Sequence, residues 1–332
     1  MKITPAQKAP PIIRDFLLYN ETVKGKSRTT IDEYFLDLQT FFRYIKMSKN
    51  LVTDSCEFED ISISDIDMDL IKSITVTDLY SFMVFCKNER SNSTTTRARK
   101  TSTIRSFFKY LKRINLIDVN PAEQLETPKI GKTLPKYLTL EQSVKLLHSV
   151  DGPFKERDYC ILTLFLNCGL RLSELCNLNL SDIRSDNSLR IKGKGNKERI
   201  VYLNDACIKA IKAYLPHRPV EGVKASDKDA LFLSKFRKRI STKTVQHIVY
   251  SYLKKAGLDG SGFSAHKLRH TAATLMYQHG NVDIRILKEI LGHENLGTTQ
   301  IYTHVSNEQT KAAISSNPLA KLASNDKEKT EG

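Results

Sequence analysis

The amino-acid sequence predicts a mainly helical protein of two domains, on three observations. Apolar residues recur at helical spacing along most of the chain. A stretch bounded by Pro128 and Pro135 interrupts this pattern and reads as a linker. Only one pair of short segments, on either side of a glycine-rich turn, has the character of β-strands. With 332 residues, 40% of them hydrophobic, the chain is long enough for two separate cores.

The composition narrows the possible partners and locations. Fifty-two Lys and Arg against thirty-seven Asp and Glu give a formal net charge of +15, which favours a polyanion as partner. No apolar run approaches the roughly 18 residues of a membrane span, and the N-terminal MKITPAQKAPP has no apolar secretion signal. The six cysteines contain no CxxC pair, which argues against a zinc or redox site. We therefore expect a cytoplasmic protein without membrane association.

The first domain, residues 1–128, is expected to be a helical bundle. Helices are predicted over 12–19, over 31–45, where a broad apolar face recurs across four turns, and from Thr77 onward. Residues 51–72 between them hold seven acids and a single Lys72. This acidic insertion predicts a loop or small hairpin that faces away from any polyanion, and a solvated segment without function is the simpler interpretation.

The last helix of this domain carries the densest positive charge. Residues 91–113 contain seven basic residues and no acid. An apolar stripe on one side leaves Arg105, Lys109 and Lys112 together on the other. Such a run is usually only a solvated face, but a run of one sign has no salt-bridge explanation. We expect DNA contacts from Arg97, Arg99, Lys100, Arg105, Lys109 and Lys112.

Residues 129–135 are the expected linker, 136–325 the second domain and 326–332 a disordered tail. Within the second domain, residues 159–168 are apolar on all sides and predict a central buried helix. Gly169 ends it, and Arg171 follows in the first turn of a new helix, with Glu174 one turn on to hold its guanidinium. An ordinary surface ion pair is the simpler interpretation, but this position after a buried helix favours a functional arginine.

The expected sheet consists of strands over 188–191 and 199–203. The glycines and asparagine of the intervening segment predict a hairpin turn, which presents lysines, including Lys194, on a movable tip. A lysine there is able to protonate a leaving oxygen, and it is equally able to serve only as a phosphate anchor. Helices are also expected over 204–215 and after the basic run 235–239.

Residues 264–304 hold the densest set of reactive side chains. A first helix places His266 and Arg269, three residues apart, on one face. A second helix ends at Gly292, so that His293 stands at a fixed helix end.

A short helical turn downstream carries Tyr302. A phenol that attacks phosphorus must lose its proton, and the five-coordinate phosphorus that forms needs rigid cationic donors for its oxygens. The planar fork of arginine matches two phosphate oxygens. The two imidazoles, the guanidinium and the phenol of this stretch therefore predict covalent chemistry at a phosphodiester, which also requires a second arginine and an acid for the leaving oxygen.

Four motifs in this order resemble the tyrosine recombinase, or phage integrase, family, and most closely its bacterial Xer branch. They are GLRLSEL at 169–175, GKGNKER at 193–199, HKLRHTAAT at 266–274 and LGHENLGTTQIYTH at 291–304. Each motif alone is weak evidence, but all four in helical and hairpin context are specific. The resemblance extends over about residues 10–320. It implies an N-terminal SAM-like core-binding domain and a catalytic domain that clamp DNA.

The resemblance implies a catalytic set of Arg171, Lys194, His266, Arg269, His293 and Tyr302. The two arginines and the second imidazole would hold the scissile phosphate, and the first imidazole would act as donor or base. The lysine would protonate the 5′-hydroxyl leaving group, while the phenol forms a 3′-phosphotyrosine. Glu174 would support the first arginine. Because a covalent intermediate conserves bond energy, and no Mg²⁺-type carboxylate cluster is present among the motifs, we expect no metal, ATP or other cofactor.

The implied reaction is site-specific recombination through a Holliday junction, either for chromosome dimer resolution or for integration and excision of a mobile element. The implied partners are double-stranded DNA with paired half-sites and a homotetramer at synapsis, or a heterotetramer with a sister recombinase. The apolar segment 311–324 must bury itself either on its own domain or, as the resemblance implies, on a neighbouring protomer. Two other classes stay open: type IB topoisomerase-like relaxation of DNA, and a DNA-binding relative without recombination activity.

Overall fold

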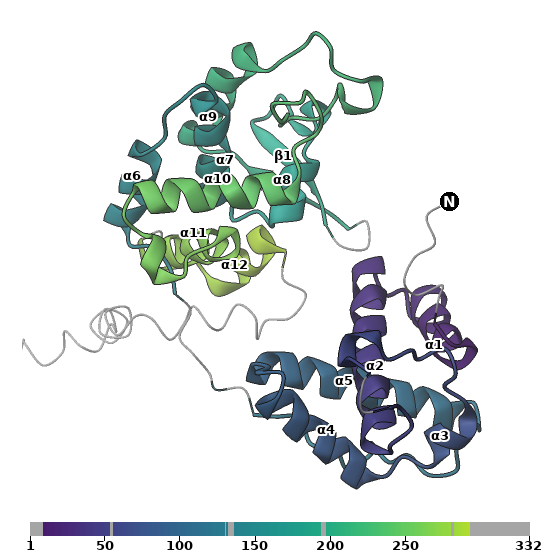
Figure 1. Cartoon of the computed structure of the whole chain (residues 1–332). Helices are drawn as coiled ribbons and strands as arrows, with labels where there is room; N and C mark the ends of the chain where they lie inside the picture. The colour runs from purple at the N-terminus through teal and green to yellow at the C-terminus, as the bar shows by residue number, and fades with distance from the viewer. Residues whose placement is uncertain are drawn as a thin grey trace, which may run out of the picture. The chain divides into compact units, whose positions relative to one another are not determined.

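The computed structural model describes residues 9–53, 56–129, 131, 136–193, 197–279 and 282–292. The chain divides into two compact units, Met1–Lys132 and Thr133–Gly332 (Figure 1). The division falls within the expected linker. Each unit has its own hydrophobic core. Among the residues just given, no helix is long and apolar enough to cross a membrane.

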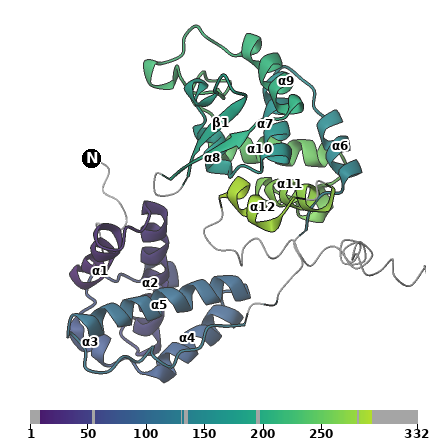
Figure 2. The same ribbon diagram turned by 180° about the vertical axis from the view of Figure 1, so that it is seen from behind.

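The first unit is a bundle of helices around an aromatic core. Its helices are α1 (Pro11–Thr22), α2 (Arg28–Ser48), α3 (Met68–Lys72), α4 (Val76–Asn88) and α5 (Thr94–Arg113). Side-chain caps fix their starts: Ser27 and Ser93 accept from the backbone of α2 and α5, and Thr75 forms a capping box with Asp78 on α4. Fully buried phenylalanines from α1, α2, α4 and α5 pack edge to face in the centre. Helices α2 and α5 lie side by side (Figure 2).

The acidic segment 51–72 departs from the expectation. Its described residues form no strand but a loop with a 3₁₀ turn (Phe58–Asp60) and the helix α3. All four of its isoleucines are buried, and Ile63, Ile66 and Ile71 belong to the core of the bundle. Two of its acids form ion pairs: Glu59 with Arg43 and Arg90, and Asp65 with Lys46. The segment is therefore packed against the bundle through its isoleucines, which corrects the interpretation as a wholly solvated insertion, while its described acidic side chains are exposed.

The described residues of the second unit form helices and one antiparallel strand pair, joined by loops. Its helices are α6 (Leu140–His148), α7 (Lys155–Cys168), α8 (Leu172–Asn177), α9 (Asp205–Tyr214), α10 (Thr242–Lys255), α11 (Ala265–His279) and α12 (Ile284–Leu291). The strands β1 (Ser188–Lys192) and β2 (Glu198–Tyr202) pair in the register Leu189↔Val201. Short 3₁₀ turns lie at Leu180–Asp182, Leu215–His217, Ala225–Asp227 and Asp259–Ser261.

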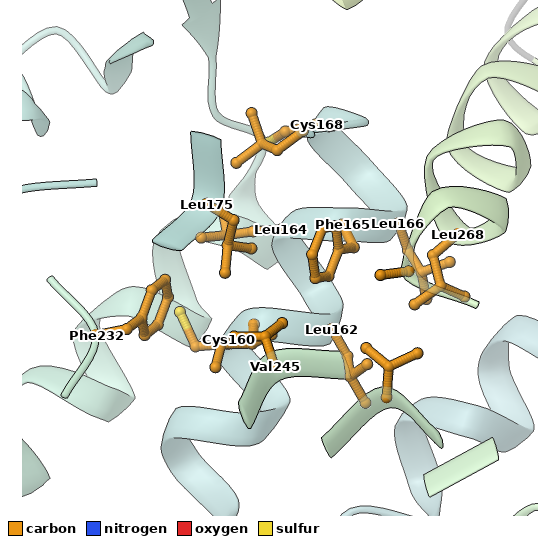
Figure 3. Close-up of a cluster of buried hydrophobic side chains, with 14 of the residues drawn as sticks. Cys160, Leu162, Leu164, Phe165, Leu166, Cys168, Leu175, Phe232, Val245 and Leu268 are labelled. Atoms are coloured by element: carbon orange, nitrogen blue, oxygen red, sulfur yellow. The ribbon is translucent and has the colours of Figure 1, made fainter. Parts of the chain in front are cut away.

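Helix α7 is the centre of this unit, as its all-apolar sequence predicts. Side chains from all its faces, among them Leu162, Leu164 and Phe165, are fully buried, and α11 packs alongside (Figure 3). The helix ends at Gly169, which has a left-handed φ of 58°. A Cβ at this position would lie 2.8 Å from Cδ2 of Leu291. Glycine is therefore needed so that α12 can approach the junction of α7 and α8.

Candidate active site

A cavity of about 650 Å³ is lined by residues of α8, α10 and α11 and of the segments that lead into α8 and α11. Arg171, His266 and Arg269 all line it, so the structure brings three of the six expected catalytic residues together. The other three lie outside the described residues: Lys194, His293 and Tyr302. The residues that precede Lys194 and His293 are described, and both lie at this site. Gly193 lies near Glu174, and the carbonyl of Gly292 accepts a hydrogen bond from Arg171. The catalytic roles of all six stay predictions.

Arg171 is held in place by Glu174, as the spacing predicts. It is the N-cap residue of α8, where its backbone N–H donates to Glu174 Oε2 at 2.8 Å and its Nη1 to Oε1 at 2.6 Å. Nη2 donates to the carbonyl oxygen of Gly292 at 2.6 Å. The side chain remains 38% exposed. One face of this guanidinium is thus fixed while part of it stays open to a ligand.

Arg269 is far more deeply buried. Its Nη1 donates to the carbonyl of Gly169 at 2.7 Å and its Nη2 to that of Leu291 at 2.6 Å, and only 4% of the side chain is exposed. Its Nη1 also lies 3.9 Å from Glu174 Oε2. Arg269 therefore joins three segments, the ends of α7 and α12 and its own helix α11.

Glu174 is the carboxylate on which this cluster is built. Its side chain is 2% exposed and accepts two parallel hydrogen bonds of 2.8 Å each from Arg199 of β2, in addition to those from Arg171. Burial alone would raise the pKa of Glu174, but the bonds from Arg199 and Arg171 outweigh it and hold the pKa at about 2. The carboxylate is therefore ionised at neutral pH and pairs with guanidinium groups on two elements.

The sequence interpretation missed Arg199. It lies 25 residues from Glu174, a separation at which helical spacing predicts nothing. A signal does exist in the strand pattern. In β2, Ile200 and Tyr202 are exposed while Val201 is buried, so period-two alternation puts Arg199 on the inward face. A charged residue on the inward face of a strand indicates a buried partner.

His266 and His270 form a pair on α11. Their Nε2 atoms are 3.0 Å apart and the rings meet edge to face. Burial, followed by the charges of Arg269 and Arg171, lowers the pKa of His266. Burial and the neighbouring His266 lower that of His270 to about 4. Both imidazoles are accordingly neutral at pH 7, which makes His266 able to accept a proton.

On α5, the six residues expected to contact DNA have different environments. Arg105, Lys109 and Lys112 are exposed on one face. Arg105 Nη1 donates to the carbonyl of Leu125 at 3.3 Å, and Lys112 forms a loose pair with exposed Glu123 at 3.7 Å. Arg97 is half-buried against Thr94. This exposed face is the one that the apolar stripe of the sequence predicts.

Arg99 and Lys100 differ because Asp37 of α2 binds both. This carboxylate is 1% exposed and accepts from Arg99 Nη1 at 2.8 Å, from Lys100 Nζ at 3.1 Å and from Thr103 Oγ1 at 2.9 Å. Lys100 is itself buried, so the expectation that it reaches DNA is corrected: it joins α5 to α2. The sequence interpretation did not find Asp37, since it adjoins the apolar face of α2.

Metal ligands do not converge in the described ranges of either unit, where no group of three or more His, Cys, Asp or Glu side chains has a suitable arrangement. The chemistry available in the cavity is that of fixed cations and a neutral imidazole. Such a set is suited to bind an anionic phosphodiester and to move a proton beside it.

Comparison with known proteins identifies the class. Residues 136–309 match the model of the phage integrase family, and residues 62–115 that of the phage integrase N-terminal SAM-like domain. The chain is 57% identical over 316 residues to tyrosine recombinase XerC of Caldanaerobacter subterraneus subsp. tengcongensis, covering 95% of this chain and 89% of that protein. It is 36% identical over 303 residues to tyrosine recombinase XerD of Proteus mirabilis, covering 90% of each.

Solved structures show the same fold. The crystal structure of XerH site-specific recombinase bound to palindromic difH substrate, a post-cleavage complex, has a TM-score of 0.70 at 24% identity and covers 95% of this chain and 97% of that one. The chain therefore belongs to the phage integrase family. Within that family it is a tyrosine recombinase, an enzyme of site-specific recombination.

Proposed function

We propose that this chain cuts and rejoins DNA at its own recombination site through a 3′-phosphotyrosine, with the six predicted residues as catalytic groups. The observation that supports this most is the shared cavity of Arg171, His266 and Arg269. The residues that precede Lys194 and His293 adjoin the same cluster, since a Cβ on Gly193 would lie 3.7 Å from Glu174 Oε1 and Gly292 is bonded to Arg171. Each group thus has an assigned place in one reaction.

In this reaction the Tyr302 oxygen forms a bond to phosphorus as the bond from phosphorus to the 5′ oxygen breaks. The phenol proton passes to His266, whose lowered pKa keeps it neutral, and Lys194 gives a proton to the departing 5′ oxygen. Arg171, Arg269 and His293 balance the charge on the other phosphate oxygens. Attack by the 5′-hydroxyl of a second duplex reverses these steps and joins the new strands. No ATP is consumed, because one phosphoester replaces another.

The partners in this proposal are double-stranded DNA with paired half-sites and three further protomers. The support is that similar proteins have been crystallised on DNA, among them XerH on difH and a lambda integrase dimer on a core site. The assembly is a homotetramer, or a heterotetramer with a sister recombinase, and it acts in the cytoplasm. The apolar segment 311–324, which lies outside the described residues, would dock on the neighbouring protomer and couple cleavage to synapsis.

Recombination between two duplexes that carry the chain's own site tests this proposal. The full chain is expected to exchange strands between them, whereas a chain that ends at Lys311 binds a single site normally but loses cooperative assembly and recombines at least about tenfold more slowly. Gel shifts and a strand-exchange assay give the two readouts. Normal recombination by the truncated chain would refute docking of the tail in trans. Efficient relaxation of a supercoiled plasmid without the site would favour the topoisomerase alternative.

The exposed face of α5 is expected to carry part of the DNA affinity. Alanine at Arg105, Lys109 and Lys112 together should weaken binding and flatten its salt dependence by up to about one unit of log–log slope per lost phosphate contact. Fluorescence anisotropy across a salt series measures this slope.

Lys100→Met is the matched control on the same helix. Because Lys100 is buried against Asp37, this change should lower the free energy of unfolding by about 1–3 kcal/mol and leave the salt slope as it is. A slope that does not change in the triple variant would make the α5 face merely solvated.

A further inference from the structure

Arg199 has every side-chain nitrogen engaged with the cluster around Glu174. Nη1 and Nη2 donate to the two carboxylate oxygens at 2.8 Å, and Nε donates to the carbonyl of Ile290 at 3.0 Å. The side chain is 14% exposed. Arginine alone can do this, because only its planar fork offers two parallel donors and a third on the adjoining edge.

The end of α12 is held by three arginines at three successive carbonyls. Ile290 O accepts from Arg199, Leu291 O from Arg269 and Gly292 O from Arg171. The last carbonyls of a helix have no partner within the helix and carry the negative end of its dipole. The three guanidinium groups therefore supply the hydrogen-bond donors that these carbonyls lack, and they neutralise the negative end of the α12 dipole. The next residue along the chain is His293.

The strand that carries Arg199 follows the hairpin turn that contains Lys194, the predicted general acid. Lys194 precedes Arg199 by five residues, and the base of the hairpin is closed by a 2.7 Å bond from the Gly193 N–H to the Lys197 carbonyl. Gly193 itself lies against Glu174. The hairpin, the arginine clamp and the α12 end thus meet on one buried carboxylate.

We propose that Arg199 is a positioning residue for DNA cleavage, which fixes Arg171 and the end of α12 relative to each other through Glu174. This inference rests on the proposed function. Arg199 does not touch the phosphate; it sets where the phosphate-binding groups stand. The competing explanation is an ordinary buried ion pair, whose loss would lower stability without a specific effect on chemistry.

Arg199→Lys separates the two explanations. Lysine keeps the charge but has one nitrogen, so it cannot bind both carboxylate oxygens and Ile290 O together. Single-turnover cleavage of a nicked suicide substrate is expected to slow by at least about tenfold at saturating protein, with DNA affinity within about twofold of wild type. Rates are compared at a temperature at which circular dichroism shows both proteins folded.

Arg190→Lys is the matched control in the same hairpin. Arg190 of β1 pairs at 3.0 Å with the buried carboxylate of Asp182, and neither residue adjoins the cavity. This variant is expected to cleave at the wild-type rate. Equal rates for Arg199→Lys and wild type, or equal losses in both lysine variants, would overturn the proposal.

A substrate with sulfur in place of the bridging 5′ oxygen gives a second readout, because a thiolate leaves without needing a proton. It should restore cleavage to Lys194→Ala but not to Arg199→Lys. Restoration in Arg199→Lys would show that this residue acts through the hairpin acid and would contradict the proposed role in the clamp. Failure of the wild-type protein to form any covalent adduct would instead refute the proposed function.

Discussion

Tyr302→Phe is expected to bind its DNA site with wild-type affinity and to form no covalent adduct with it. The change removes only the hydroxyl, which is the group proposed to attack phosphorus, so folding and binding should be retained while the reaction is lost. A suicide substrate traps the 3′-phosphotyrosine, and a denaturing gel detects it as a shifted protein band. The expected decrease is to below the detection limit, on the order of a thousandfold or more.

Tyr202→Phe serves as the control for this experiment. Tyr202 is 76% exposed on β2, so its loss of a hydroxyl should leave adduct formation as in wild type. An adduct that persists in Tyr302→Phe would mean that another group is the nucleophile.

Lysine at Arg171 or at Arg269 is expected to reduce the cleavage rate by more than tenfold with little change in affinity for DNA. In the proposed reaction both guanidiniums act where negative charge develops on the phosphate, and a single ammonium cannot replace two parallel donors. Single-turnover kinetics measures the rate, and anisotropy measures the affinity. If both variants cleave at normal rates, the phosphate-binding site lies elsewhere.

The two lysine variants are expected to differ in stability, because the two arginines differ in burial. Arg269 is 4% exposed and serves the carbonyls of Gly169 and Leu291, so Arg269→Lys leaves a buried acceptor without its donor and should lower the free energy of unfolding by about 1–3 kcal/mol. Arg171 is 38% exposed and its replacement should cost less stability. Thermal unfolding of the two variants side by side checks the order, and a more stable Arg269→Lys than Arg171→Lys would contradict it.

Local patterns predict the elements of this fold well. The all-apolar run within α7 and the glycine after α12 place helix ends within a few residues of those observed. The same holds for the pair of Arg171 and Glu174, because their three-residue separation is itself a helical contact. Helix ends and contacts within a single helix can therefore be predicted from the local sequence.

Contacts between elements are what the patterns could not supply. Lys100 belongs to a basic run, but Asp37 on another helix, 63 residues away, decides that it is buried. Glu59 of 51–72 pairs with Arg43 of α2 and with Arg90, which follows α4, and neither pair is predicted by the local pattern. A charged residue in a sequence can be exposed to solvent, bind a partner or form a buried ion pair. Only the structure distinguishes these three environments.

The cluster around Glu174 also leaves a charge imbalance in the folded protein. Three guanidiniums, of Arg171, Arg199 and Arg269, lie within 4 Å of one carboxylate, which leaves two positive charges (3 − 1 = 2) within this cluster. Folding therefore brings like charges together before DNA arrives, and their repulsion is part of the free protein. A phosphodiester supplies one of the missing negative charges, and the pentacovalent phosphorane, with two, supplies both. In the proposed reaction, the cluster would be closest to neutral at the top of the barrier, where the protein is required to hold its substrate most tightly.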